Sequence, residues 1–267
     1  MENKKTAKQP IKNITGMSKS KQDLNREIQD GVTDWEYKKN LRKKNSLSKE
    51  EFQKNTVRLS DKQNTLYKGI RNNILTVVHG PAGTSKTYTT CYTALALLAD
   101  KKIEKIIITK PIQESGENLG FLPGSMEDKL HPYKQSYYTT FSKIIGKSAT
   151  DMLFATEEIV FEPLAYMRGS TYDDCIMLLD ECQNASIKQL MLWITRLGKD
   201  SKAVMMGDTS QYDVRKKDSG YNDFIKMVGG MQDLNLFEFS NEDIVRNKFL
   251  VEIANRYDKY RSEQKDF

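Results

Sequence analysis

The sequence has few of the residues that hold metal ions or cross-link a fold. Its 267 residues include three cysteines and two histidines. Cys91, Cys175 and Cys182 are odd in number and lack the spacing of metal ligands, and only His79 and His131 remain to join them. This pattern excludes a structural zinc site and favours buried thiols in a reducing cytoplasm.

Long apolar runs are also missing. No stretch approaches the roughly 18 apolar residues that span a bilayer, and the polar, lysine-rich N-terminus lacks the apolar core of a signal peptide. The sequence therefore predicts a cytoplasmic protein without a membrane partner. No internal repeat is evident, and no carboxylate cluster indicates a nuclease site.

The charge of the chain is concentrated at its N-terminus. The net charge is +6 at pH 7, and residues 1–55 account for all of it because basic and acidic residues balance in the remainder. The basic cluster at 38–44 lies near Trp35 and Tyr37, whose rings are candidates for stacking on bases. We interpret residues 1–55 as a basic extension, partly disordered or helical. It either binds nucleic acid or serves only as a solvated tail.

From about residue 56, short apolar runs alternate with helix-like segments. Strands are expected at 74–78, 106–109, 159–161, 176–179, 203–206 and 234–239, and helices at 88–98, 126–145, 186–197, 220–227 and 242–260. Capping-box pairs at Ser60/Gln63 and Ser240/Asp243 predict the start of a helix to about Asn72 and of the last helix. The alternation predicts a doubly wound α/β domain over residues 56–267, a mostly parallel sheet with helices on both faces.

The most informative segment is GPAGTSKT, between the first expected strand and a helix. The amides of such a loop and of the following helix N-terminus attract phosphate. Lys86 would reach the β- and γ-phosphates, and the Thr87 hydroxyl would hold Mg²⁺. Ser85 replaces the second glycine of the motif, which serine can do if the backbone needs no strongly positive φ. The predicted phosphate-binding residues are Gly80, Pro81, Ala82, Gly83, Thr84, Ser85, Lys86 and Thr87.

Two later strands end in polar residues that would face the same pole of the sheet, because ligands bind at the carboxyl ends of parallel strands. Asp180 would bind Mg²⁺ with Thr87, and Glu181 would act as general base. Asp208 and Gln211 would sense the γ-phosphate. Each pattern alone is also that of an ordinary strand end or turn, but together with the glycine-rich loop they predict a nucleoside triphosphatase.

Five segments resemble the PhoH family, over roughly residues 56–260 and in the family's order. They are GPAGTSKT at Gly80–Thr87, the GFLPG-containing segment Thr109–Gly124, PLAYMRG at Pro163–Gly169, LLDECQN at Leu178–Asn184 and MGDTSQYD at Met206–Asp213. The resemblance implies a RecA-like P-loop ATPase related to the first motor domain of superfamily 1 helicases. It also implies a hexameric ring and a role in RNA metabolism.

Carried over by position, the resemblance assigns phosphate and Mg²⁺ binding to Gly80, Gly83, Lys86 and Thr87, the metal and water roles to Asp180 and Glu181, and the γ-phosphate sensor to Asp208 and Gln211. Gln63, on the helix before the first strand, would read adenine through its amide. The chain departs from the family at Ser85, usually glycine, and at Cys182, usually alanine. Both are small residues, so they bear on rate more than on nucleotide binding.

A superfamily 1 motor closes its site with an arginine from a second motor domain, which this chain lacks. The arginine would come from the C-terminal part of the chain or from a neighbouring subunit, as in other systems that supply it in cis or in trans. Arg246 is the first candidate, followed by Arg196 and Arg168. Arg168 and Lys110 are alternatively candidates for contacts with a nucleic-acid backbone.

The leading interpretation is an ATPase that binds ATP and Mg²⁺ and acts on single-stranded nucleic acid, with RNA favoured over DNA, in a helicase-like or remodelling role. A P-loop kinase is a second possibility, which Glu181 and the sensor-like turn at Asp208 disfavour. A third is a nucleotide-gated assembly protein with little turnover.

Overall fold

The computed structural model describes residues 46–55, 58–111, 126–208, 218–245 and 247–263. Their centre is a six-stranded, all-parallel sheet in the order β3-β2-β4-β5-β1-β6. All six strands were predicted to within two residues at either end: β1 (Leu75–His79), β2 (Lys105–Thr109), β3 (Ile159–Phe161), β4 (Cys175–Leu179), β5 (Lys202–Gly207) and β6 (Leu234–Glu238). The predicted α/β fold is confirmed.

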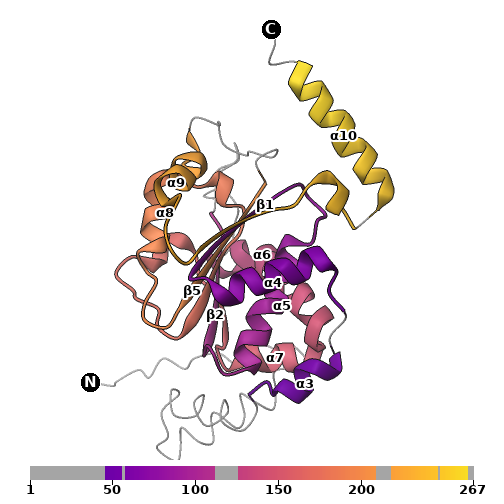
Figure 1. Ribbon diagram of the computed structural model, residues 1–267. Helices are drawn as coiled ribbons and strands as arrows, with labels where there is room; N and C mark the ends of the chain where they lie inside the picture. The colour runs from indigo at the N-terminus through magenta and orange to yellow at the C-terminus, as the bar shows by residue number, and fades with distance from the viewer. Residues whose placement is uncertain (1–45, 56–57, 112–125, 209–217, 246, 264–267) are drawn as a thin grey trace, which may run out of the picture. The chain divides into compact units, whose positions relative to one another are not determined.

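Helices cover both faces of the sheet, as Figure 1 shows. One apolar core joins the sheet to α3 (Lys49–Asn55), α4 (Asp61–Asn72), α5 (Lys86–Ala99), α6 (Met126–Ile145) and α7 (Lys147–Ala155). The other face packs against α8 (Ile187–Ile194) and α9 (Tyr221–Val228). Because both faces of the central strands are buried, their sequences are continuous apolar runs.

Strand order fixes which loops meet. In parallel strands all carboxyl ends lie at one edge, which we call the carboxyl pole, and all amino ends at the opposite amino pole. β5 lies between β1, which leads into the glycine-rich loop, and β4, which ends before Asp180. The three polar strand ends of the sequence analysis are therefore neighbours.

Local capping chemistry sets several helix boundaries. The Ser60 hydroxyl accepts from the backbone N–H of Gln63, whose side chain accepts in return from Ser60, and α4 runs to Asn72 as predicted. The same reciprocal bonding by Ser186 and Gln189 begins α8. α7, which the sequence analysis did not anticipate, follows Gly146, whose φ of +83° ends α6.

The prediction of one helix over residues 242–260 was wrong. Ser240 and Asp243 do form a capping box, but it caps a single 3₁₀ turn, η5 (Asn241–Asp243). The chain is then extended at Ile244, and the N–H of Val245 donates to the Gly83 carbonyl at 3.1 Å. Helix α10 spans Lys248–Glu263. A tertiary bond to the glycine-rich loop therefore replaces the helix that local pattern favoured.

The packed part of the chain also includes residues that the sequence analysis assigned to the extension. Leu47 and Phe52 are buried in the core beside α5, and the Phe52 ring meets Tyr92 edge-on with centroids 5.1 Å apart. The compact unit accordingly begins at Leu47. None of the helices in the described ranges is long and apolar enough to cross a membrane.

Candidate nucleotide-binding site

The glycine-rich loop packs against the backbone that follows β6, an edge strand of the sheet. β1 ends at His79 and α5 begins at Lys86, so residues 80–85 form the turn between them. Gly80 has a φ of +147°, and a Cβ on it would lie 2.6 Å from the Phe239 carbonyl oxygen. No side chain fits there, because the backbone after β6 occupies that space.

Ser85 is in the left-handed region, with φ 68° and ψ 24°. The sequence analysis allowed serine at this position on condition that no strongly positive φ was needed, and that condition is not met. A left-handed conformation costs a residue with a Cβ about 1–2 kcal/mol. The loop therefore keeps the backbone geometry that glycine serves and carries strain there.

The Lys86 ammonium group lies folded over the loop. Its Nζ donates to the carbonyl oxygens of Gly80 and, at 2.9 Å, of Pro81. Burial lowers the pKa of Lys86, and the charges of Asp208, Glu181 and Asp180 oppose that shift. A half-buried cation is thus held beside the glycine-rich loop, where it can pair with an anionic ligand.

The end of β4 supplies two carboxylates in different surroundings. Burial, followed by the charge of Glu181, raises the pKa of Asp180, and Lys110 opposes the rise. The Glu181 N–H donates to Asp180 Oδ1 at 3.1 Å, with Glu181 itself in the left-handed region at φ 53°. Tyr137 of α6 is buried beside this pair, and its pKa is raised by burial and then by the Asp180 charge.

Gln183 connects the ends of β4 and β5. Its Nε2 donates to Glu181 Oε2 at 2.8 Å, and its Oε1 accepts from the Asp208 N–H at 3.0 Å. Gly207 allows this contact, because a Cβ there would lie 2.8 Å from Cys182 Sγ and 3.1 Å from Gln183 Oε1. The buried Gln183 side chain thus joins the predicted base to the predicted sensor strand.

These groups line one cleft of about 460 Å³, within the size range of small-molecule sites. Of the predicted site residues, the cleft brings together Ala82, Gly83, Thr84, Ser85, Lys86, Thr87, Asp180, Glu181 and Asp208. Gly80 and Pro81 lie behind it, bonded to Lys86 through their carbonyls. Gln211 and Arg246 lie outside the described residues.

Three other candidates do not line the cleft. Gln63 uses its side-chain oxygen to accept from the Ser60 N–H at 2.9 Å, which gives a structural reason for a glutamine at this position. The Arg196 guanidinium donates to the Ser170 carbonyl at 3.1 Å, and Arg168 is exposed after the 3₁₀ turn η2 (Leu164–Met167).

The donor set fits Mg²⁺ bound together with a nucleotide. Thr87 and Asp180 both line the cleft and offer hydroxyl and carboxylate oxygens, the ligands that Mg²⁺ prefers, and the ion takes its remaining ligands from water and substrate phosphates. Within the described ranges no three His, Cys, Asp or Glu side chains cluster as a complete metal cage. The metal would therefore be shared between protein and phosphate.

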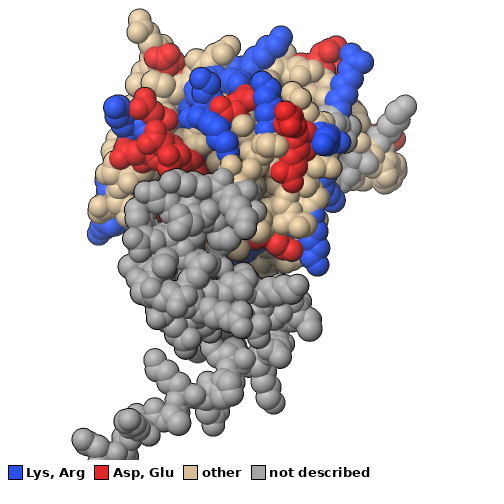
Figure 2. All heavy atoms as spheres, turned by 90° about the horizontal axis from the view of Figure 1, so that it is seen from below, with Lys and Arg blue, Asp and Glu red and all other residues tan. Residues whose placement is uncertain are grey.

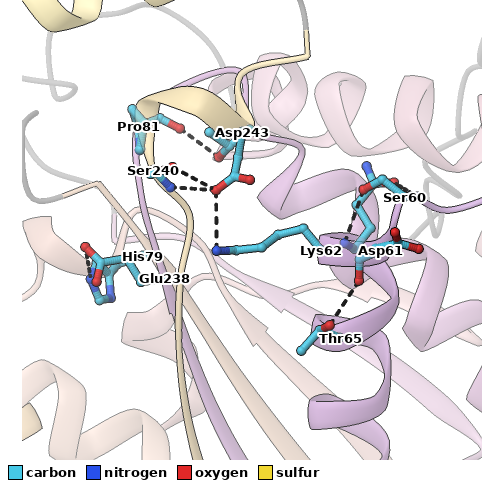
Figure 3. A network of polar contacts seen from close by, with 11 residues as sticks. Ser60, Asp61, Lys62, Thr65, His79, Pro81, Glu238, Ser240 and Asp243 are labelled. Atoms are coloured by element: carbon cyan, nitrogen blue, oxygen red, sulfur yellow. Dashed lines mark hydrogen bonds and ion pairs between the residues drawn. The ribbon is translucent and has the colours of Figure 1, made fainter.

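Polar contacts connect the elements beside the loop to one another (Figure 3). Asp243 Oδ2 accepts from the Ser240 N–H at 2.8 Å and lies 3.6 Å from Lys62 Nζ on α4. His79 Nε2 at the end of β1 is 3.2 Å from Glu238 Oε1 on β6. The segment that contacts Gly80 and Gly83 is in this way tied to both α4 and β1.

The sequence model of the family described as PhoH-like protein matches residues 55–258. The chain belongs to this family. It is 37% identical to a PhoH-like protein of Bacillus subtilis over 80% of this chain and 69% of the relative. It is 37% identical to a PhoH-like protein of Mycobacterium tuberculosis, over 68% of this chain and 52% of the relative. It is 31% identical to Protein PhoH of Escherichia coli, over 71% of this chain and 54% of the relative. The chain thus spans 52% to 69% of the length of these relatives.

Solved structures with a similar arrangement include the Pyrococcus furiosus Hef helicase domain. Its TM-score is 0.43 at 11% identity, over 72% of this chain and 39% of that one. The Sulfolobus solfataricus SWI2/SNF2 ATPase core in complex with dsDNA has a TM-score of 0.44 at 12% identity, over 72% of this chain and 47% of that one. Because both scores are low, the RecA-like assignment rests on the strand order and the family.

Sequence reasoning missed three contributors to the PhoH-like site: Gln183, Tyr137 and the face of α6 that lines the cleft. Gln183 stands two residues after Glu181 inside a motif that had been recognised, so its position was a usable signal. Tyr137 and the α6 residues carry no local signal, because only tertiary packing brings α6 against the end of β4.

Proposed function

We propose that this PhoH-like chain is a Mg²⁺-dependent ATPase. One observation carries the proposal: Lys86, Asp180, Glu181 and Asp208, from three neighbouring strand ends, converge on one cleft whose base is the glycine-rich loop. Water activation needs a carboxylate beside the phosphate cradle, and Glu181 meets that need. A membership in the PhoH-like family supports the same conclusion.

In this mechanism the residues of the chain bind and orient the triphosphate. The backbone N–H groups of residues 82–87 and the Lys86 ammonium neutralise the β- and γ-phosphates, and Glu181, held by Gln183, accepts the proton of the attacking water. Thr87 and Asp180 would hold Mg²⁺, which supplies Lewis-acid charge to the phosphate oxygens. We propose Asp208 and Gln211 as the γ-phosphate sensor, Gln63 as the adenine contact and Arg246 as a cation contributed to a neighbouring site.

We further propose that the substrate is single-stranded RNA and that the chain works as a hexameric ring in the cytoplasm. The part of the basic extension that precedes both the packed unit and the family match, residues 1–46, is the proposed electrostatic contact with the RNA backbone. In the part of the described surface that Figure 2 shows, Lys and Arg lie among Asp and Glu.

The test is steady-state ATP hydrolysis with and without single-stranded RNA, with free phosphate as the measured product. Wild-type turnover should rise with RNA. Lys86→Ala should lower kcat about 100-fold or more, whereas Lys199→Ala, which removes an exposed lysine from the amino pole, should leave it unchanged. A phosphorylated acceptor in place of free phosphate would identify a kinase, and turnover indifferent to nucleic acid would remove the motor role.

A nucleotide-gated assembly protein with slow turnover is the second candidate, favoured by the strained backbone at Ser85. It predicts tight ATP binding with turnover that stays negligible under every condition. Size-exclusion chromatography with ATP and with ADP, at equal protein concentration, would then show an oligomer that depends on the nucleotide rather than on its hydrolysis.

A further inference from the structure

The cleft has a second wall, which belongs to α6 and has no assigned role. Ser136, Thr140 and Lys143 line the cleft together with residues of the glycine-rich loop. They are spaced by four and three residues, so they share one face of the helix. The adjoining face holds Tyr137, Phe141 and Ile144 in the core, which fixes the rotation of α6 and directs the polar stripe into the cleft.

Two lysines besides Lys86 line the cleft, Lys110 and Lys143. Lys110, after β2, lies 3.9 Å from Glu181 Oε1 and has its Nζ 5.1 Å from the centre of the Tyr133 ring of α6. Lys143 is exposed at the mouth. Lys86 is bonded to the loop carbonyls. A phosphate group bound at the loop would thus have two further cations in the same cleft.

We propose that Lys143 is a catalytic residue of this chain's own site, contacting the γ-phosphate during hydrolysis, with the Ser136 hydroxyl as a neighbouring donor; the Thr140 hydroxyl donates to the Ser136 carbonyl at 3.0 Å. The inference rests on the proposed ATPase function and deepens it. The charge that other nucleotide-hydrolysing enzymes take from an arginine is here supplied in cis by a helix of the same domain.

The chemistry balances with the groups named. The water oxygen forms a bond to Pγ while the bond from Pγ to the β–γ bridging oxygen breaks. ADP leaves with that electron pair, and the water proton passes to Glu181 and then to solvent. Negative charge shifts to the bridging and γ-oxygens, and an ammonium on the α6 side stabilises it more in the transition state than in the ground state.

The decisive measurement compares affinity for ADP alone with affinity for ADP plus aluminium fluoride and Mg²⁺, which mimics the transferring phosphoryl group. Removing one such donor costs about 100-fold in comparable sites. Because Lys143 is exposed, we expect Lys143→Met to lower the fluoride-dependent gain in affinity about 10-fold or more. The Kd for ADP should change less than about two-fold. Lys143→Arg should restore most of the gain, since it keeps the charge.

Lys147→Met is the matched control, because it removes an exposed lysine four residues further along, outside the cleft lining. It should behave as wild type in both titrations. A wild-type gain that persists in Lys143→Met overturns the proposal, as does a loss confined to stimulation by RNA, which would make Lys143 a nucleic-acid contact. The proposed ATPase function fails separately, if wild-type protein shows no affinity gain with fluoride and no turnover.

Discussion

Residues other than glycine adopt positive φ at both poles of the sheet, but only those at the carboxyl pole line the cleft. Among the described residues, seven other than glycine have positive φ. Five of them lie in turns just before a strand, at the amino pole: Lys101, Glu157, Asp174, Asp200 and Asp233. All five are exposed. The other two, Ser85 and Glu181, lie at the carboxyl pole and line the cleft.

The difference lies in what surrounds the charges. At the amino pole Lys199 and Asp200 approach to 3.8 Å with 86% and 66% of their side chains exposed, so water screens the pair and it adds little stability. At the carboxyl pole the Lys110–Glu181 pair is 26% and 38% exposed and adjoins Asp180, whose pKa is raised by burial. Burial of charge alone does not distinguish the poles, because Arg71 and Asp100 at the amino pole are only 25% and 20% exposed. What distinguishes the carboxyl pole is that its lysines and carboxylates line one cleft.

The largest expected effect comes from the two glutamates that share this conformation, Glu181 at φ 53° and Glu157 at φ 57°. Glu181→Gln should lower kcat about 10²–10⁴-fold because it removes the proton acceptor, while ATP stays bound. Glu157→Gln should leave kcat unchanged. Single-turnover hydrolysis with bound-nucleotide analysis measures both. Equal losses in the two variants would show that the loss in Glu181→Gln does not come from removing a proton acceptor in the cleft.

A second test compares two glutamines: Gln183, which connects the ends of β4 and β5, and Gln189, which caps α8. Gln183→Leu removes the bonds to Glu181 and to the Asp208 N–H, so it should lower both kcat and stability, the latter by about 1–3 kcal/mol because a buried donor loses its acceptor. Gln189→Leu breaks the α8 capping box and should cost about 1 kcal/mol of stability without changing kcat.

Urea unfolding gives the stabilities in that pair of variants and steady-state kinetics gives kcat. If kcat of Gln183→Leu falls no more than that of Gln189→Leu, the bridge between β4 and β5 is structural only. A Glu181→Gln/Gln183→Leu double variant provides a further check. Its loss should be smaller than the two single losses combined, because both changes act on the same proton acceptor.

Sequence patterns predicted the secondary structure correctly where contacts between residues close in the sequence determine it. The six strands are short apolar runs buried on both faces, and the reciprocal bonds of Ser60 and Gln63 start α4 where the motif placed it. The pattern failed after Ser240, because the bond from Val245 to Gly83 depends on a loop more than 150 residues earlier in the chain. Helix propensity alone does not register such a contact.

The same division holds for the site. The glycine-rich loop and the Asp180–Glu181 pair each lie within one continuous motif, so sequence identified them, and the parallel sheet explains why they meet. Tyr137 and Lys143 sit on a helix that reads as ordinary and amphipathic. Lys143 lines the cleft and Tyr137 is buried beside Asp180 because Phe141 and Ile144 pack in the same core, an arrangement that no short motif encodes.

The smallest expected effect is the most direct test of backbone strain at the two poles. Ser85→Gly and Asp200→Gly each place glycine at a left-handed position, so relief of the Cβ clash competes with the larger entropy of the unfolded chain. We expect each variant to raise the free energy of unfolding by about 0.5 kcal/mol, which corresponds to roughly 1–2 °C in Tm. Only Ser85→Gly should also change ATP turnover, because only Ser85 lines the cleft. Calorimetry measures the change in stability, and phosphate release measures the change in turnover.

Turnover that rises in Ser85→Gly with Asp200→Gly unchanged would assign a kinetic cost to serine in the phosphate loop. Destabilisation of Ser85→Gly would instead show that the serine side chain itself supports the loop.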